Sequence, residues 1–201
     1  MNIISNNCFG GYIYKNVLKT EYTTPFIWSR IYNDDLIKLL SNFKTINFNN
    51  IELKKKDKNL EDGFYIEIDN LVKVYYNHYK FDKNCNKPTL KDDLGNPVNN
   101  WSIDIHYNKI WEYIIEKYNN RLNRMNFNDN FVLALEDNRD NLLLEKIIPL
   151  AENLNFKLII ITKKNIKPSK KLMVLHTNFN KDFPGYFADN YCNEIKSFLN
   201  S

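Results

Sequence analysis

The side chains nearest the amino terminus carry the groups that group-transfer reactions use. A hydroxyl, two amides and a thiol follow an apolar stretch, at Ser5, Asn6, Asn7 and Cys8. A cysteine just before a helix is a candidate nucleophile, because the N–H groups of the first turn favour its thiolate. Ser5 is a second candidate, and the amides are suited to donate hydrogen bonds to an oxyanion. The alternative interpretation is structural, with a buried thiol and turn-forming polar groups.

A glycine pair follows this segment. Gly10 and Gly11 are two of only five glycines in the chain. Glycine lets the backbone approach a ligand closely or adopt positive φ. The segment from Ser5 to Gly11 is therefore the first candidate binding site.

A histidine and an aspartate form a second candidate. His106 stands two positions after Asp104 in an alternating stretch that predicts a strand over residues 101–107. Alternate residues share one face of a strand, so the carboxylate can orient the imidazole as a general base. The alternative is an exposed histidine on a strand edge.

Two arginines close a predicted helix over residues 109–124. Arg121 and Arg124 are three positions apart and can point together toward a phosphate or carboxylate, or simply complement the helix dipole. Asp137 and Asp140 allow a weak divalent-cation site or a substrate contact. The histidines lack metal-binding spacing and the cysteines lack a Cys-x-x-Cys pair, so we expect no tightly bound metal and no disulfide framework.

The elements that would position these residues alternate between strands and helices. Buried parallel strands are predicted over residues 1–5, 131–135, 157–161 and 172–175. Helices are predicted over residues 11–18, 33–43 (capped by Asn33), 109–124, 141–154 and 187–199. The middle section, with strands over residues 51–55, 65–68 and 71–76, is expected to be antiparallel or irregular. The fold class is therefore α/β, a layered sandwich with a mainly parallel, Rossmann-like sheet.

We expect residues 1–201 to form a single domain with a loop insertion at residues 81–100. Ligands of parallel sheets bind beyond the carboxyl ends of the strands. That rule predicts one shared site from the segments that follow the strands, namely Ser5 to Gly11, His106, Glu136 to Asp140, Thr162-Lys163 and His176-Thr177.

Composition limits the partners. The 28 basic and 24 acidic residues give a net charge of +4, which is too small and too mixed for a nucleic-acid surface. No window of 18 apolar residues predicts a membrane span, and no signal peptide is evident. We therefore expect a cytoplasmic protein; its oligomeric state stays open.

The chain resembles the bacterial family called domain of unknown function nineteen-nineteen (DUF1919), often labelled exopolysaccharide biosynthesis protein. The resemblance is carried by Ser5 to Gly11, Thr24-Pro25-Phe26, Asp34-Asp35, Asp104 to Tyr107, Arg121 to Asn126, Asn130-Phe131-Val132 and Asp137 to Asp140. The first segment is also loosely similar to a Gly-Asn-Cys turn of capsule-biosynthesis acyltransferases and to the first block of SGNH-type esterases. The terminal Asp-x-x-His of those esterases is absent. The resemblance implies a role in building surface glycans.

These observations lead to one main hypothesis and two alternatives. The main one is a sugar acyltransferase that uses acetyl-CoA and acts on a sugar or nucleotide-sugar substrate. Its oxyanion would bind at the Ser5 to Gly11 turn, its base would be His106 with Asp104, and its phosphate contacts would be Arg121 and Arg124. The alternatives are a nucleotide-sugar glycosyltransferase in which Asp137 and Asp140 hold a metal and the sugar nucleotide, and a non-catalytic glycan-assembly binding protein.

Overall fold

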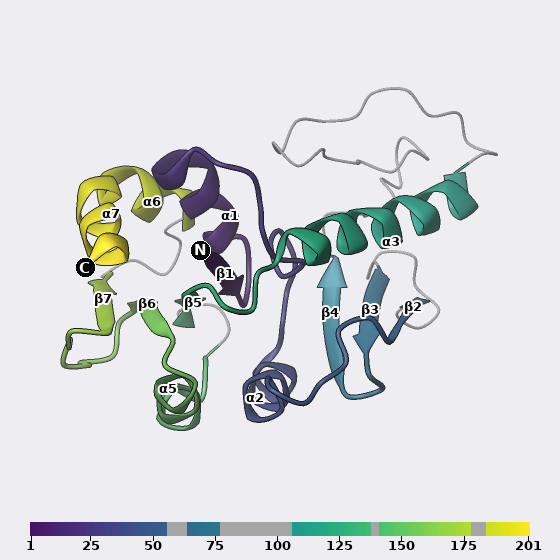
Figure 1. The fold of residues 1–201 in the computed structure, drawn as a ribbon. Helices are drawn as coiled ribbons and strands as arrows, with labels where there is room; N and C mark the ends of the chain where they lie inside the picture. The colour runs from purple at the N-terminus through teal and green to yellow at the C-terminus, as the bar shows by residue number, and fades with distance from the viewer. Residues whose placement is uncertain (56–63, 77–105, 138–140, 178–183) are drawn as a thin grey trace.

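The computed structural model describes residues 1–55, 64–76, 106–137, 141–177 and 184–201, and within them it contains two sheets (Figure 1). One sheet has four parallel strands in the order β1-β5-β6-β7. The other has three antiparallel strands in the order β2-β3-β4. The predicted α/β class, the parallel sheet and the antiparallel middle section are confirmed.

The parallel sheet is buried on both faces. Its strands are β1 (Asn2–Ser5), β5 (Phe131–Glu136), β6 (Lys157–Thr162) and β7 (Leu172–His176). Their alternate residues enter two different cores. One core receives Ile3, Val132, Ile159 and Leu175, and the other receives Ile4, Leu133, Ile160 and Leu172. Burial on both sides explains why these strands are continuous apolar runs rather than alternating ones.

Helices cover each face of this sheet. One core lies against α1 (Phe9–Tyr12), the π-helix η1 (Ile13–Leu18), α6 (Pro184–Asn190) and α7 (Cys192–Asn200). The other lies against α2 (Asn33–Ser41) and α5 (Leu144–Asn153), which contact each other. Pro149 lies inside α5, which falls within the predicted helix over residues 141–154.

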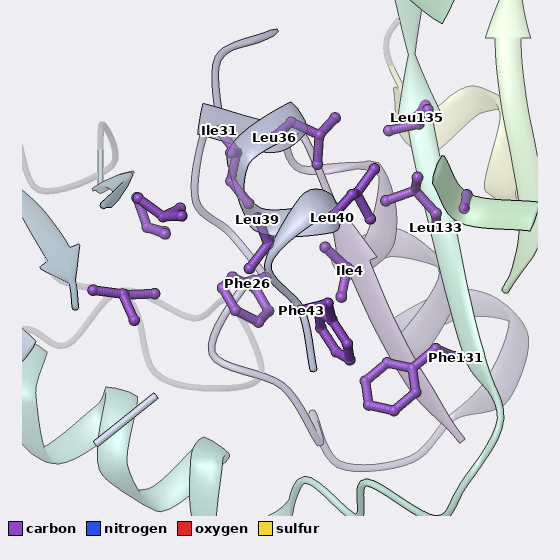
Figure 2. Close-up of a cluster of buried hydrophobic side chains, with 14 of the residues drawn as sticks. Ile4, Phe26, Ile31, Leu36, Leu39, Leu40, Phe43, Phe131, Leu133 and Leu135 are labelled. Carbon is purple, nitrogen blue, oxygen red and sulfur yellow. The ribbon is translucent and has the colours of Figure 1, made fainter. Parts of the chain in front are cut away.

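The antiparallel sheet extends the second core. Its strands are β2 (Ile51–Lys55), β3 (Phe64–Ile68) and β4 (Val72–Tyr76), and the long helix α3 (His106–Arg124) runs over them (Figure 1). Side chains from both sheets, α2 and α3 form one continuous apolar cluster. Figure 2 shows part of it, with Ile4, Leu133 and Leu135 of the parallel sheet facing the leucines of α2.

The outer edge of β1 is closed by η1 and by the segment that follows it. The Tyr14 hydroxyl accepts a hydrogen bond from the N–H of Ile3 at 3.0 Å, and the Thr24 hydroxyl donates one to the Ile3 carbonyl. Further along, the N–H of Ile31 donates to the Asn6 carbonyl at 3.0 Å. These bonds satisfy the backbone groups of an edge strand that would otherwise be open to pairing. Residues 24–31 therefore fix the position of the turn after β1.

Several boundaries differ from the sequence prediction. Helical structure after β1 begins at Phe9, two residues early. Asn33 does not cap α2: it is the first helical residue, and its side chain bonds the backbone of Asn141 and Leu143. The predicted terminal helix is two helices, α6 and α7, which are separated at Tyr191, where φ of −112° and ψ of 25° depart from helical values.

The predicted strand over residues 101–107 is wrong at its end. His106 is the first residue of α3, which begins three residues before the predicted helix. The reason is visible in the sequence: Tyr107, Ile110 and Ile114 continue the helical spacing of three to four residues. Residues 101–105 and the expected insertion at 81–100 lie outside the described residues.

Candidate functional site

Polar side chains converge at the carboxyl ends of the parallel strands. Those that are almost fully buried are Ser5, Asn6, Glu136, Asp137, Thr162 and Thr177. Together with Asn7, Cys8 and Lys164 we call them the carboxyl-edge cluster. The strand ends thus meet as the sequence predicted, although many of these polar groups bond to one another.

Asn6 and Asn7 join the end of β1 to the end of β5. The Asn6 amide donates to the Glu136 carbonyl at 3.1 Å, and its oxygen accepts from the Glu136 N–H at 2.9 Å. The neighbouring Asn7 amide donates to the Glu136 carboxylate at 2.6 Å. A buried carboxylate is costly unless donors surround it, so Asn7 compensates part of the desolvation of Glu136.

Asp137 joins β5 to the segment after β6. Its carboxylate accepts from the Leu142 N–H at 2.6 Å, the Thr162 hydroxyl at 2.9 Å and the Lys164 ammonium at 3.1 Å. These three donors use most of the about four lone-pair positions of the carboxylate. In the part of the chain that the structure describes, no group of three His, Cys, Asp or Glu side chains is arranged to hold a metal.

Donors of the first turn already bond to acceptors in the turn itself or in β5. The Gly10 N–H donates to the Ser5 hydroxyl at 3.1 Å, and that hydroxyl donates to the Ala134 carbonyl at 2.8 Å. The Phe9 N–H donates to the Asn7 side-chain oxygen at 2.9 Å. In this conformation the turn therefore stabilises itself, and its predicted oxyanion donors already have acceptors.

The two glycines serve close packing. Both belong to α1, with helical backbone rather than positive φ. A β-carbon at Gly10 would come within 2.8 Å of the Ser5 β-carbon, and one at Gly11 within 2.5 Å of the Trp28 indole. Ser5 and Trp28 thus occupy the space beside these glycines, where a closely bound ligand or a positive φ was predicted.

Cys8 supplies the thiol of the cluster. It directly precedes α1 with helical dihedral angles, its side chain is half-buried, and it is not in a disulfide. Tyr12 lies one helical turn further, and its pKa is raised to about 12 by burial, and then by the nearby Cys8 and Asp189. Tyr12 therefore stays neutral beside the thiol.

Arg121 and Arg124 are not part of the carboxyl-edge cluster. Arg121 is 1% exposed, donates to the Ile27 carbonyl at 2.8 Å and lies 5.2 Å from the centre of the Tyr22 ring. Arg124 donates to the Tyr22 carbonyl at 2.8 Å. The next residue, Thr23, bonds the Met1 carbonyl, so Arg124 lies near the amino end of β1. Both arginines hold the 22–28 segment in place.

The predicted base, His106, also lies far from the carboxyl-edge cluster, at the other end of the long helix α3. The backbone of His106 lies at the start of α3, and Arg124 at its end, 19 residues in all. At 1.5 Å per residue the helix is about 28 Å long. Figure 1 shows the starting end of α3 directed away from the parallel sheet. Asp104 lies outside the described residues.

Sequence reasoning missed two residues at this site. Lys164 pairs with Asp137, whereas the predicted site included only Thr162 and Lys163 from this segment. The position of Lys164 could have been predicted, because the residues just after β6 lie at the same edge of the sheet as Asp137. Trp28, with φ of 58°, had no comparable signal, because its contact with Gly11 depends on the path of the 24–31 segment.

The strand order, the two helical layers and the polar carboxyl edge define an α/β protein with a parallel sheet. The model of the family described as Domain of unknown function (DUF1919) matches residues 1–184, and the chain belongs to this family. Comparisons with curated proteins and with solved structures gave no match. None of the helices in the described ranges is long and apolar enough to cross a membrane.

Proposed function

We propose that this protein is a sugar acyltransferase that uses acetyl-CoA, and that Cys8 carries the acyl group between donor and acceptor. The observation that carries the proposal is the position of Cys8: a half-buried thiol between β1 and α1, at the edge of a parallel sheet where ligands bind. A thiol in this position is activated when nearby N–H groups and cations favour its thiolate.

The proposed reaction has two balanced steps. In the first, the Cys8 sulfur attacks the thioester carbonyl; a new carbon–sulfur bond forms, the bond to the coenzyme sulfur breaks, and free coenzyme A leaves with the proton that Cys8 lost. In the second, a sugar hydroxyl or amine attacks the carbonyl of acyl-Cys8; a bond from the acyl carbon to the sugar oxygen or nitrogen forms, the bond to the Cys8 sulfur breaks, and the proton of the acceptor returns to that sulfur. Splitting the transfer in this way lowers the barrier of each step.

The proposal assigns phosphate binding to different residues from those that the sequence suggested. Arg121 and Arg124 are engaged with backbone carbonyls away from the carboxyl-edge cluster. Lys163 and Lys164 are exposed and follow β6 at the edge where Cys8 lies, and the Lys164 ammonium also bonds Asp137 and the Leu142 carbonyl. Ammonium groups at that edge are suited to the phosphates of a coenzyme. His106 remains a candidate for the acceptor base only if α3 or the acceptor brings the two regions together.

One observation favours a second candidate, a glycan-assembly binding protein without catalysis. The turn N–H groups and the amides of Asn6 and Asn7 donate to acceptors within the protein. A catalytic oxyanion site normally keeps donors available for the developing charge. Glycosyl transfer is less well supported, because Asp137 is surrounded by three donors.

Calorimetric titration separates these functions. Acetyl-CoA and nucleotide sugars, the latter with and without Mn²⁺, are titrated into wild-type protein and into Lys163→Ala and Lys164→Ala variants. The proposal expects acetyl-CoA binding that weakens in the lysine variants. Metal-dependent binding of nucleotide sugars alone would instead support glycosyl transfer, and binding of neither would support the non-catalytic candidate.

A further inference from the structure

We propose that a second site, at the opposite edge of the parallel sheet, binds a neutral carbohydrate. A cleft of about 790 Å³ opens between the ends of α2, α3 and α5, beside Phe131 at the start of β5 and Phe156 just before β6. We call it the amino-edge cleft. Its volume lies within the range of small-molecule sites, about 300–1,000 Å³. The inference does not depend on the proposed acyl transfer.

The floor of the cleft is a cluster of aromatic rings. The ring centres of Phe43, Phe131 and Phe156 are 5.0 Å from one another, and all three side chains are buried. Figure 2 shows Phe43 beside Phe131 at one end of the apolar cluster. Closely packed rings of this kind give a stiff base.

Phe127 lies on this base but is largely exposed. Its ring centre is 5.5 Å from that of Phe48 and 6.3 Å from those of Phe43 and Phe131, while 53% of the residue is accessible. In the described ranges, Phe127 and Tyr186 are the large hydrophobic side chains that are exposed. An apolar ring supported on one side and open on the other offers a flat surface to a ligand.

Hydrogen bonds fix the loop that carries Phe127. The Asn126 side chain donates to the Asp129 carboxylate at 3.2 Å and accepts from the Asn128 N–H at 3.0 Å. The Asn2 amide donates to the Asn126 carbonyl at 2.6 Å, which ties the loop to β1. A ring on a fixed loop loses little conformational entropy when a ligand binds.

The polar lining is rich in amides. Exposed asparagines line the cleft at Asn47, Asn49, Asn123, Asn128, Asn130 and Asn155. A carboxamide both donates and accepts hydrogen bonds, as a sugar hydroxyl does. The charged side chains of the lining, Lys44 and Asp129, have opposite signs, so the cleft does not select an anion. A sugar ring, with one apolar face and an edge of hydroxyls, matches this combination.

A protein partner fits the cleft less well. A stable interface buries about 800 Å² on each partner around an apolar centre. Phe127 is the one exposed large hydrophobic side chain that the described part of the cleft offers. One ring among amides suits a small polar ligand better than a second protein chain.

A glycan array of neutral oligosaccharides, followed by calorimetry on the bound glycans, tests the inference. We expect wild-type protein to bind, Phe127→Ala to bind about tenfold more weakly or not at all, and Phe127→Trp to retain binding. Tyr186→Ala, at the other exposed ring, should bind as wild type. Because Phe127 is exposed, its variants should unfold at the wild-type urea concentration.

Three results would overturn the inference: binding to no glycan on the array, binding that Phe127→Ala leaves unchanged, or a concentration-dependent dimer that Phe127→Ala abolishes without any glycan binding. Loss of binding in Cys8→Ser but not in Phe127→Ala would move the sugar site to the carboxyl-edge cluster. That outcome would contradict the cleft and leave the proposed acyl transfer standing.

Discussion

The indole of Trp28 packs directly on Gly11, so closely that a β-carbon at Gly11 would come within 2.5 Å of the ring. Trp28 itself has φ of 58°, a left-handed conformation that is unfavourable for a residue with a side chain. The ring is held further by Tyr12, whose centre is 4.9 Å away in an edge-to-face arrangement. This contact joins the turn after β1 to the segment that covers the edge of β1.

Gly11→Ala should therefore destabilise the protein. In an open helix this change would stabilise by about 1 kcal/mol, but overpacking against a fixed ring costs about 1–3 kcal/mol, so a net loss is expected. Urea unfolding measures it. Replacing Trp28 by leucine in the same chain should restore part of the loss. Equal or greater stability in Gly11→Ala would show that the ring is free to move.

We expect Asn6 to stabilise the fold rather than to contact a ligand. It is fully buried and bonds both backbone polar groups of Glu136. Asn6→Ala leaves those groups without these partners, and we expect a loss of about 2–3 kcal/mol. Asn6→Asp should be at least as damaging, because a carboxylate would face the Glu136 carbonyl. Asn193→Ala, at an exposed position of α7, is the matched control and should change stability little.

Arg121 should likewise support the fold. Arg121→Ala removes a charged hydrogen bond to Ile27 and the packing on Tyr22, and we expect a loss of about 2–3 kcal/mol in the free energy of unfolding. Arg124→Ala, at a half-buried position, should lose less. If instead Arg121→Ala unfolds like wild type and only weakens the binding of a phosphate-containing ligand, the structural role is wrong.

Asp35 gives a pH dependence with a definite sign. Burial raises its pKa above the ordinary 3.8, although its carboxylate accepts from the Lys73 N–H and lies near Lys38. Between 3.8 and the raised value the folded state keeps a proton that the unfolded state has lost, so stability falls as pH rises. Asparagine keeps the acceptor and does not titrate. Asp35→Asn should therefore gain stability relative to wild type as pH rises from 3.8 toward neutrality.

Urea unfolding of both proteins at several pH values tests this expectation. The difference between their free energies of unfolding should grow with pH and then level off. A constant difference would mean that Asp35 has the same pKa in both states, and a decreasing one would mean that its charge stabilises the fold.

Most of the fold could be predicted from local pattern. The apolar runs before Ser5 and Asp137 and the run at 157–161 predict buried strands, because only a sheet covered on both faces is apolar at every position. The start of α3 at His106 was harder to predict, because the residues there fit both the alternation of a strand and the spacing of a helix. The split at Tyr191 rests on the dihedral angles of one residue, which no pattern of apolar residues reveals.

The candidate site was only partly predictable. The rule for parallel sheets correctly brought Asn6, Glu136 and Asp137 to one edge, because strand direction alone decides it. It did not show that the side chains would bond to one another. Arg121 was misplaced because helical spacing fixes which face it shares with Arg124 but not what covers that face. The amino-edge cleft joins parts of the chain that no local motif connects.

The central claim is that Cys8 carries the acyl group. Wild-type protein incubated with acetyl-CoA and no sugar, and then measured by intact-protein and peptide mass spectrometry, should carry one acetyl group on the Cys8 peptide as a hydroxylamine-sensitive thioester. Cys192→Ser, which changes the other half-buried cysteine of the described chain, should be labelled in the same way, and Cys8→Ser should carry no thioester. Sugar acetylation that proceeds at the wild-type rate in Cys8→Ser, with no thioester at position 8 in the wild type, would contradict the claim.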